Sequence, residues 1–410
     1  MTIEITQSYL PIEENIQITG SKSESNRMLL LQALYPDIRI RNLSNSHDSS
    51  VMQKALASGQ EVVDIHHAGT AMRFLTAYFS IQDGRETVLT GSSRMQERPI
   101  KILVDALRQL GALITYEKTP GCPPLRIRGS KLKGNRVVLD AGVSSQYISA
   151  LMLIAPKFPG GLEILLKGKI TSVPYIRMTL QLLADCGIKG SFEGPAIRIL
   201  PHQEPVEKTI TVESDWSSAS YFYSIAALAP AAKITLSSYK QKSYQGDSVL
   251  ADIYSALGIA TTYGTNSITL EKKTKTVPTE FYPDGLNLTN APDIAQTIAV
   301  TCFGLGIPCY ITGLHTLKIK ETDRLEALKI ELEKLGALVE ITDDTLRLHA
   351  RKNINSGVAI DTYQDHRMAM AFAPLGICTD INILEAEVVA KSYPDYWKDL
   401  RKLGITCTES

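Results

Sequence analysis

The sequence predicts an α/β protein built from two similar lobes. Its 410 residues exceed the size at which a single hydrophobic core keeps growing, so two domains are expected. One pattern returns six times along the chain: an amphipathic helix, a stop that is Leu-Gly in the clearest copies, and a short β-branched run. The copies are too widely spaced for a solenoid, so the simplest arrangement is three αβ units in each lobe.

The helix of each copy is recognised by its apolar spacing. In the copy at 99–116, Leu103, Leu107 and Leu110 recur at the spacing of one helix face. The six copies lie at 47–65, 99–116, 174–192, 246–263, 323–341 and 393–408, and the first and last are the weaker ones. In five of them a glycine stands where a helix end requires a left-handed residue: Gly111, Gly187, Gly258, Gly336 and Gly404.

The boundary between the lobes is predicted from composition. Residues 194–209 are rich in Pro, Gly, Glu and Lys, and Ser214-Asp215 then forms a typical N-cap pair before an apolar helix. The second lobe is therefore expected to begin near 214. The strand-like residues 3–18 fit either lobe on composition alone.

Composition also limits the possible partners and the compartment. Lys+Arg and Asp+Glu are equal at 43 each, so no excess charge indicates a nucleic-acid or membrane partner. The six cysteines are scattered without metal-ligand spacing, as expected of reduced thiols in a cytoplasmic protein without a metal site. The start of the chain lacks a leader pattern. The apolar stretch 294–311 is broken by Gln296, Gly304 and Pro308, which argues against a membrane span.

The first candidate site segment is GSKSESNR at 20–27. A Gly/Ser turn that opens a helix presents free backbone N–H groups, and Lys22 and Arg27 add positive charge beside them. This combination predicts an anion site. A capped helix start with solvated basic residues is an equally good interpretation of these eight residues.

Three further segments of the first lobe could bind anions or hydroxyl groups. AGTAMR at 68–73 would let a ligand approach the backbone of Gly69, although Arg73 is as well explained as a structural ion-pair partner. The loop at 94–99 carries Arg94 directly before a repeat helix. Ser144-Ser145-Gln146 offers hydroxyls and an amide, which read equally well as helix caps.

The second lobe carries the most informative polar segments. KETDR at 320–324 opens an amphipathic helix, and Asp-His-Arg at 365–367 leads into an apolar helix, where charges are costly unless they are paired or used. Asp293 precedes another helix and could be its cap. Lys391 follows a strand-like run, and taken without the other segments it would be interpreted as a solvated surface lysine. The cations of all these loops are Lys22, Arg27, Arg94, Lys320, Arg324, Arg367 and Lys391, with the carboxylates Asp293 and Glu321 among them.

This set predicts an enzyme that joins two anionic small molecules. The cations suffice for a phosphate and two carboxylates, and the carboxylates remain as a base and an acid. Taken together, the motifs resemble those of the 5-enolpyruvylshikimate-3-phosphate synthase family, in the family's order and over almost the whole chain. They are GSKSESNR (20–27), AGTAMR (68–73), RMQERP (94–99), SSQ (144–146), SVPY (172–175), PDIAQTIA (292–299), KETDRL (320–325), QDHRMAM (364–370) and AKSYPDYW (390–397).

The resemblance implies a two-lobed, inside-out α/β barrel with three βαβαββ units per lobe. It implies that residues 1–16 join 214–410 in the carboxy-terminal lobe, that 17–213 form the amino-terminal lobe, and that the active site lies in the cleft between them. The implied reaction moves the enolpyruvyl group of phosphoenolpyruvate to the 5-hydroxyl of shikimate 3-phosphate by addition and elimination. It also implies a cytoplasmic monomer that needs no metal and no organic cofactor.

The resemblance assigns the site residues as follows. Shikimate 3-phosphate would be bound by Lys22, Ser23, Arg27, Ser144, Ser145, Gln146, Ser172, Tyr175, Asp293, Thr316 and Lys320. Phosphoenolpyruvate would be bound by Lys22, Gly69, Arg94, Gln146, Arg324, Arg367 and Lys391. Asp293 would take the hydroxyl proton, Glu321 would protonate the methylene carbon, and Lys22 and Lys391 would assist proton transfer and phosphate departure.

Three residues depart from the family pattern. His67 and Phe74 replace the usual Asn and Pro around the phosphoenolpyruvate loop, and Thr316 replaces an Asn, so affinity at these points is expected to differ. A sister transferase that acts on UDP-N-acetylglucosamine is the nearest alternative, but the cysteine it carries on a first-lobe loop is absent from 84–99. A non-catalytic anion-binding homologue would be expected to lack one of the four catalytic residues.

Overall fold

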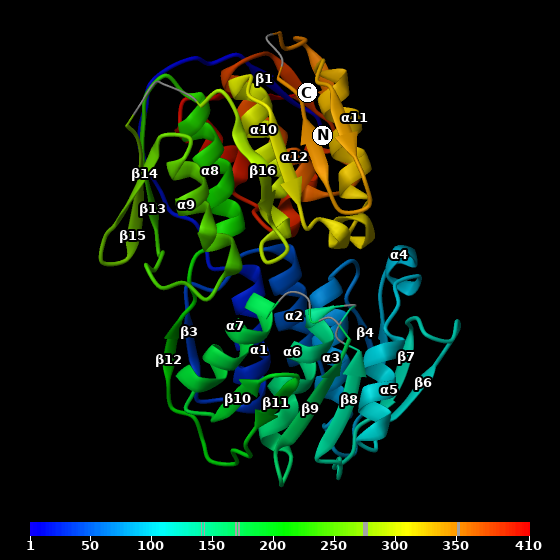
Figure 1. Ribbon diagram of the computed structural model, residues 1–410. Coiled ribbons are helices and arrows are strands. Elements are labelled where there is room, and N and C mark those ends of the chain that lie inside the picture. Colours follow the sequence, from blue (N-terminus) through cyan, green and yellow to red (C-terminus); the bar gives the residue numbers. More distant parts are fainter. Residues whose placement is uncertain (141, 143, 169, 171–172, 274–277, 351–352) are drawn as a thin grey trace. The chain divides into compact units, whose positions relative to one another are not determined.

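The computed structural model describes residues 1–140, 142, 144–168, 170, 173–273, 278–350 and 353–410. The chain forms two compact units (Figure 1). The amino-terminal unit is Gly20–Val212, and the carboxy-terminal unit joins Met1–Thr19 to Glu213–Ser410. The first unit is therefore an insertion in the second. Each unit is described on its own.

The amino-terminal unit contains two four-stranded sheets and a parallel pair among its described residues. The sheets are β4-β5-β7-β6 and β10-β11-β9-β8, and the pair is β12-β3. The strands are β3 (Arg39–Arg41), β4 (Val62–Asp64), β5 (Glu86–Thr90), β6 (Leu113–Tyr116), β7 (Leu125–Arg128), β8 (Arg136–Asp140), β9 (Leu162–Lys167), β10 (Gly190–Glu193), β11 (Ala196–Ile199) and β12 (Thr209–Thr211). The helices are α1 (Lys22–Leu34), α2 (His47–Ala57), α3 (Gly69–Ser80), α4 (Ser93–Gln96), α5 (Lys101–Gln109), α6 (Ser145–Ile154), the 3-10 turn η1 (Ala155–Lys157) and α7 (Val173–Asp185).

The carboxy-terminal unit contains three four-stranded sheets, β14-β15-β13-β2, β16-β17-β19-β18 and β20-β21-β1-β22, in the part of the chain that is described. The strands are β1 (Ile3–Thr6), β2 (Ile12–Ile16), β13 (Ala232–Ser237), β14 (Ile259–Tyr263), β15 (Ser267–Lys272), β16 (Phe281–Asn287), β17 (Cys309–Thr312), β18 (Val339–Ile341), β19 (Leu346–Leu348), β20 (Val358–Ile360), β21 (Ile381–Ile383) and β22 (Thr406–Glu409). The helices are α8 (Trp216–Leu228), α9 (Leu250–Ser255), α10 (Ala295–Leu305), α11 (Arg324–Lys334), α12 (His366–Phe372) and α13 (Tyr396–Lys402). Short 3-10 turns are η2 (Gly246–Val249), η3 (Pro292–Ile294), η4 (His315–Ile319), η5 (Ala373–Ile377) and η6 (Ala386–Lys391).

All five four-stranded sheets share one strand pattern. The first two strands run parallel and the remaining two pair antiparallel, so that the fourth strand lies between the second and the third. A helix joins the parallel strands, except that the whole amino-terminal unit as well as α8 lies between β2 and β13. The sheet β16-β17-β19-β18 shows this connection in full, with α10 after β16, α11 after β17 and a hairpin from β18 to β19. The predicted α/β fold with βαβαββ units is thereby confirmed. Three such sheets form the carboxy-terminal unit as predicted, whereas the described residues of the amino-terminal unit form two, with the pair β12-β3 in place of a third.

The third sheet of the carboxy-terminal unit takes its fourth strand from the start of the chain. Strand β1 lies between β21 and β22 and is antiparallel to both, with Ile3 opposite Ile383 and Glu409. Composition could assign residues 3–18 to either lobe, and this pairing places β1 in the carboxy-terminal unit.

The predicted repeat corresponds to the second helix and third strand of each sheet, with one exception. The copies from 99–116 onward are α5–β6, α7–β10, α9–β14, α11–β18 and α13–β22. The weak copy at 47–65 is α2 followed by β4, which is the first strand of the next sheet. The glycines that end the helices of these five copies have φ between 81° and 99°, the left-handed region that favours glycine.

The carboxy-terminal unit has a continuous hydrophobic core. Helices α8, α10 and α12 are buried on nearly all sides, and their residues contact one another and the sheets. The apolar stretch 294–311 divides into α10 and β17, as its Gly and Pro residues predicted. Within the described residues, none of the helices has the length and apolar character needed to cross a membrane.

Candidate active site

A single buried arginine organises the polar segments of the carboxy-terminal unit. Arg324 is the first residue of α11, whose N-terminus is capped by Asp323, and only 2% of its side chain is exposed. Its Nε donates to Asp365 at 2.6 Å, its Nη1 to Asp293 at 2.9 Å and its Nη2 to Glu321 at 2.8 Å. Arg324 can therefore be buried because its charge is paired, and it joins the KETDR segment to Asp293 and Asp365, which are distant in sequence.

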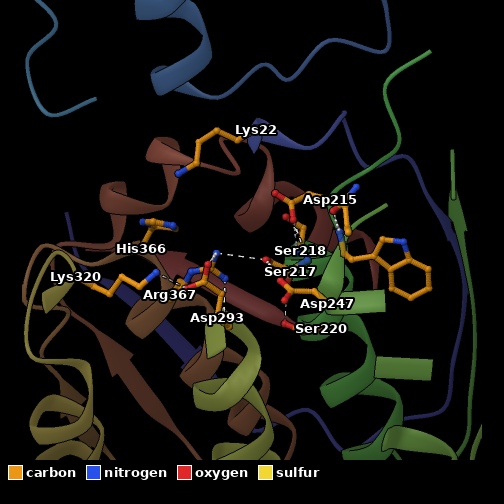
Figure 2. Close-up of polar contacts among 12 residues, drawn as sticks. Lys22, Asp215, Ser217, Ser218, Ser220, Asp247, Asp293, Lys320, His366 and Arg367 are labelled. Carbon is orange, nitrogen blue, oxygen red and sulfur yellow. Dashed lines mark hydrogen bonds and ion pairs between the residues drawn. The ribbon is translucent and has the colours of Figure 1, made fainter. Parts of the chain in front are cut away.

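Asp293 contacts three cations from two segments of the chain. Besides Arg324, it lies 3.2 Å from Nη2 of Arg367 and 3.4 Å from Nζ of Lys320 (Figure 2). Burial alone would raise the pKa of Asp293, but Arg367, Lys320 and Arg324 hold it well below its ordinary value. Asp293 lies inside the turn η3 and is not the N-cap residue of η3 or of α10, which are Ala291 and Ile294.

Asp365 is both a helix cap and an ion-pair partner. It is fully buried, caps α12 by accepting the backbone N–H of Arg367 at 2.9 Å, and pairs with Arg324. The Asp-His-Arg segment is thus both a helix cap and part of the ion-pair cluster. This cap fixes the first turn of α12 and with it the position of Arg367.

Arg367 links Asp293 to a second buried carboxylate. Its Nη1 donates to the backbone oxygen of Asp293 at 3.0 Å, and its Nη2 donates to Oγ of Ser217 at 3.3 Å. The Ser217 hydroxyl donates in turn to Asp247, as Figure 2 shows. Burial raises the pKa of Asp247 to about 7, an effect that Asp293 increases and Arg367 opposes.

Lys391 and Thr316, the other two predicted residues of this unit, lie in short 3-10 turns. Lys391 ends η6 and its Nζ donates to the backbone oxygen of Gln364 at 2.7 Å, directly before Asp365. Oγ1 of Thr316, in η4, is shielded from solvent and has no hydrogen-bond partner within the described part of the chain. A hydroxyl in that state is available to a ligand.

In the amino-terminal unit, α1 carries the first predicted anion segment. Its helix begins at Lys22, and its N-cap residue Ser21 makes no side-chain cap hydrogen bond. Lys22 lies 3.4 Å from Asp48, and Arg27 is buried. The alternative of a start capped by Ser21 with solvated basic residues is therefore not what the structure shows.

Arg27 is held by hydroxyl groups and by aromatic rings. It is 2% exposed, and its Nε donates to Thr179 at 2.7 Å and its Nη2 to Ser149 at 2.9 Å. Its Cζ lies 5.4 Å from the ring centroid of Phe74 and 5.8 Å from that of Tyr175. Burial lowers the pKa of Arg27 to about 10, so it remains cationic at neutral pH.

Arg27 also contacts the segment it belongs to. Its Nη1 donates to the backbone oxygen of Ser23 at 2.7 Å, one turn earlier in α1. The structure thus brings together three predicted residues, Ser23, Arg27 and Tyr175, and adds Phe74, one of the departures from the family pattern. Ser172, which was predicted beside Tyr175, lies outside the described residues.

The remaining predicted residues of this unit surround the start of α3. Gln146, in α6, donates through Nε2 to Oγ1 of Thr70 at 3.1 Å, beside Gly69. A Cβ on Gly69 would come within 2.7 Å of Nη1 of Arg98, so the Arg98 side chain lies against the backbone of Gly69. Ser144 caps α6 by accepting the N–H of Gln146 at 3.3 Å, and Ser145 is buried beside it.

Arg94 stands apart from these groups. It is 66% exposed in α4 and pairs with Glu97 at 2.9 Å. In the same region Nδ1 of His67 lies 2.8 Å from Oγ of Ser92, which ties the departure before Gly69 to the N-cap of α4. Arg73, whose Nη1 donates to the backbone oxygen of Gly69 at 2.9 Å, shapes this turn through its backbone contact.

Sequence reasoning missed four polar partners. Ser149 and Thr179 hold Arg27, and the available signal was a hydroxyl inside an otherwise apolar helix. Ser217 accepts from Arg367 and donates to Asp247, but in the sequence each of the two is an ordinary residue of a first helical turn. In the residues that the structure describes, no group of three or more His, Cys, Asp or Glu side chains is placed to hold a metal ion.

Comparison of the sequence with known proteins identifies its relatives. The sequence profile of the family described as EPSP synthase (3-phosphoshikimate 1-carboxyvinyltransferase) matches residues 50–400. A 3-phosphoshikimate 1-carboxyvinyltransferase from Bacteroides fragilis (strain YCH46) is 49% identical over 96% of each chain. One from Histophilus somni (strain 2336) is 36% identical over 96% of this chain and 97% of its own.

Solved structures share the fold. EPSP synthase from Acinetobacter baumannii superposes with a TM-score of 0.81 at 21% identity, covering 99% of both chains. The enolpyruvyl transferase NikO from Streptomyces tendae gives 0.77 at 16% identity, covering 100% of this chain and 98% of its own. At these identities the two structures support the fold alone.

Proposed function

This chain belongs to the EPSP synthase (3-phosphoshikimate 1-carboxyvinyltransferase) family, and on that premise we propose that it transfers the enolpyruvyl group of phosphoenolpyruvate to shikimate 3-phosphate. The products are 5-enolpyruvylshikimate 3-phosphate and phosphate. The family predicted from the nine motifs is confirmed by relatives that share almost the full length of the chain.

One observation carries the chemical side of the proposal. Asp293 and Glu321 share the guanidinium of Arg324, and Lys320 and Arg367 also lie within 3.4 Å of Asp293. An enzyme that adds an alcohol to an anionic alkene needs a base, an acid and cations for the anion. All three kinds of group lie together in this one unit.

Each unit supplies residues for the two substrates in this proposal. For shikimate 3-phosphate they are Lys22, Ser23, Arg27, Ser144, Ser145, Gln146, Ser172 and Tyr175 in the amino-terminal unit, and Asp293, Thr316 and Lys320 in the other. For phosphoenolpyruvate they are Lys22, Gly69, Arg94 and Gln146 in the amino-terminal unit, and Arg324, Arg367 and Lys391 in the other. The hydroxyl-held guanidinium of Arg27 suits a phosphate, because it is charged, buried and already oriented.

The reaction proceeds in two steps. In the addition step, Asp293 takes the proton of the 5-hydroxyl as its oxygen attacks C2 of phosphoenolpyruvate, and Glu321 gives a proton to the methylene carbon. The product of this step is a tetrahedral ketal phosphate. In the elimination step, the new methyl group returns a proton to the enzyme and the C2–phosphate bond breaks, while Lys22 and Lys391 neutralise the departing phosphate.

Substrate binding would turn Asp293 into a stronger base. In the free protein its cations hold the pKa well below the ordinary value, which makes the carboxylate a weak proton acceptor. Phosphoenolpyruvate brings a carboxylate and a phosphate that compete for Arg324 and Arg367. As these cations turn to the substrate, Asp293 loses stabilisation of its charged form and its proton affinity rises.

Phosphate release tests the function directly. Purified protein is mixed with phosphoenolpyruvate and shikimate 3-phosphate, and inorganic phosphate is measured over time, with UDP-N-acetylglucosamine as the control acceptor. Release only with shikimate 3-phosphate is the expected result. Release only with the control acceptor would refute the proposal in favour of the sister transferase, and release with neither would favour a non-catalytic anion-binding homologue.

We further propose that the protein works as a monomer in the cytoplasm without a metal or organic cofactor. All six cysteines are free thiols, as expected in a reducing compartment. Electrostatic stabilisation by cations and orientation of the substrates supply what the reaction needs. Sedimentation of the purified protein measures the oligomeric state, and turnover in the presence of a chelator measures the metal requirement.

A further inference from the structure

The Ser217–Asp247 pair has no role in the reaction as described so far. Ser217 lies in the first turn of α8, which Asp215 caps by accepting the backbone N–H groups of Ser217 and Ser218. Asp247 lies in η2, thirty residues further along the chain. Both side chains are buried, with 8% and 6% of their surface exposed.

The direction of the hydrogen bonds gives this pair a function. A hydroxyl has one proton, and the Ser217 proton is donated to the Asp247 carboxylate. The Ser217 oxygen is then left with its lone pairs directed elsewhere, and it accepts from Nη2 of Arg367 at 3.3 Å. Asp247 therefore keeps Ser217 in the acceptor state that a guanidinium requires.

Arg367 needs such an anchor because its other contacts are on one side. Its Nη1 and Nη2 both contact Asp293, through the backbone oxygen at 3.0 Å and the carboxylate at 3.2 Å. If a substrate carboxylate displaces the Asp293 side chain from Arg367, the contact with Ser217 still fixes the guanidinium. We infer that Ser217 and Asp247 are positioning residues that hold Arg367 ready for phosphoenolpyruvate, an inference that rests on the function proposed above.

Charge and position predict opposite effects for one substitution. Asp247→Asn removes a negative charge close to an anion site, so charge alone would lower the KM for phosphoenolpyruvate. The neutral amide of Asn is a weaker acceptor than a carboxylate and can turn its N–H group toward Ser217 instead, which frees the Ser217 hydroxyl to turn its proton toward Arg367, so the positioning role predicts a higher KM. We expect the KM for phosphoenolpyruvate to rise about tenfold, with the KM for shikimate 3-phosphate and kcat changing less than about twofold.

Ser217→Ala changes no charge and should give the same selective rise in the KM for phosphoenolpyruvate. Since the two residues act through one chain of contacts, Ser217→Ala/Asp247→Asn should be no worse than Ser217→Ala alone. Ser217→Thr keeps the hydroxyl and should restore most of the affinity. Ser224→Ala is the matched control, because Ser224 is a buried hydroxyl on the same helix that contacts Thr301.

The experiment is a steady-state series at pH 8, above the pKa of Asp247, accompanied by equilibrium binding of phosphoenolpyruvate to the same proteins. A lower KM in Asp247→Asn, additive effects in the double variant, or equal rises in both KM values would overturn the inference. Failure of the wild-type protein to release phosphate would instead refute the proposed function. The binding series still tests the positioning role in that case, because a tenfold loss of affinity confined to the Ser217 and Asp247 variants supports it and its absence refutes it.

Discussion

Arg324→Ala tests whether the carboxylate cluster depends on one buried guanidinium. The substitution removes a cation that lies within 2.9 Å of Asp365, Asp293 and Glu321, of which Asp365 is fully buried. Breaking one buried ion pair costs about 3–5 kcal/mol. In the variant Asp293 still pairs with Lys320, and the side chain of Glu321 is partly exposed to solvent. We therefore expect a total cost of about 5 kcal/mol, not the sum for three separate buried pairs. For a unit of about 200 residues this lowers Tm by about 10–20 °C.

The pH dependence gives a second, independent check. The pKa of Asp293 is depressed in the folded protein, so its contribution to stability is complete above the unfolded value of about 3.9 and is lost as pH falls below it. Arg324 is one source of that depression, so the Tm difference between wild type and variant should stay constant from pH 8 to about 5 and shrink below about 4. Thermal unfolding is followed by circular dichroism, with Lys233→Ala, which breaks an exposed pair with Glu13 in the same unit, as the control. A loss no larger than that of the control, or a gap that widens in acid, would refute the reasoning.

Three further predictions address the base, the phosphate anchor and the helix ends. Asp293→Ala should keep most of its substrate binding but lose about 10²–10⁴ in turnover; turnover near wild type would show that another group is the base. Thr179→Val removes the acceptor of the Arg27 Nε bond and should raise the KM for shikimate 3-phosphate about tenfold, with a smaller change for phosphoenolpyruvate; an unchanged KM would exclude this role. Gly187→Ala forces an alanine to φ near 82° and should lower the free energy of unfolding by about 1–2 kcal/mol. Gly59, where a Cβ meets no atom within 4 Å, is the control site, and an equal loss there would contradict a backbone cause.

The sequence predicted the parts of the fold that depend on local pattern. Helix spacing identified the six copies of the repeat, and positive φ at Gly111, Gly187 and the equivalent positions follows from the need to end each helix. Asp215 caps α8 as its neighbours predicted. The place of the weak copy at 47–65 was not predictable, because whether a strand closes one sheet or opens the next depends on its tertiary partners.

The same division applies to the candidate site. The motifs pointed to Arg324, Arg367 and Asp293, because charged residues beside apolar helices require partners. They did not show which partner each would take: Asp293 lies inside η3, after its N-cap residue, and its ion pairs are with residues that follow it by 27 to 74 positions. The contacts of Ser217 with Asp247 could not be predicted, since two first-turn residues thirty positions apart carry no mutual signal in a single sequence.

The position of β1 determines the order in which the protein can assemble during synthesis. The residues of the amino-terminal unit are contiguous, so that unit can fold while the ribosome is still producing the second half of the chain. Strand β1 is made first but is paired on both sides, with β21 and with β22. It cannot reach its place until Thr406–Glu409 has left the ribosome. Strand β1 therefore completes its pairing on both sides only after both β21 and β22, hundreds of residues later in the sequence, have been made.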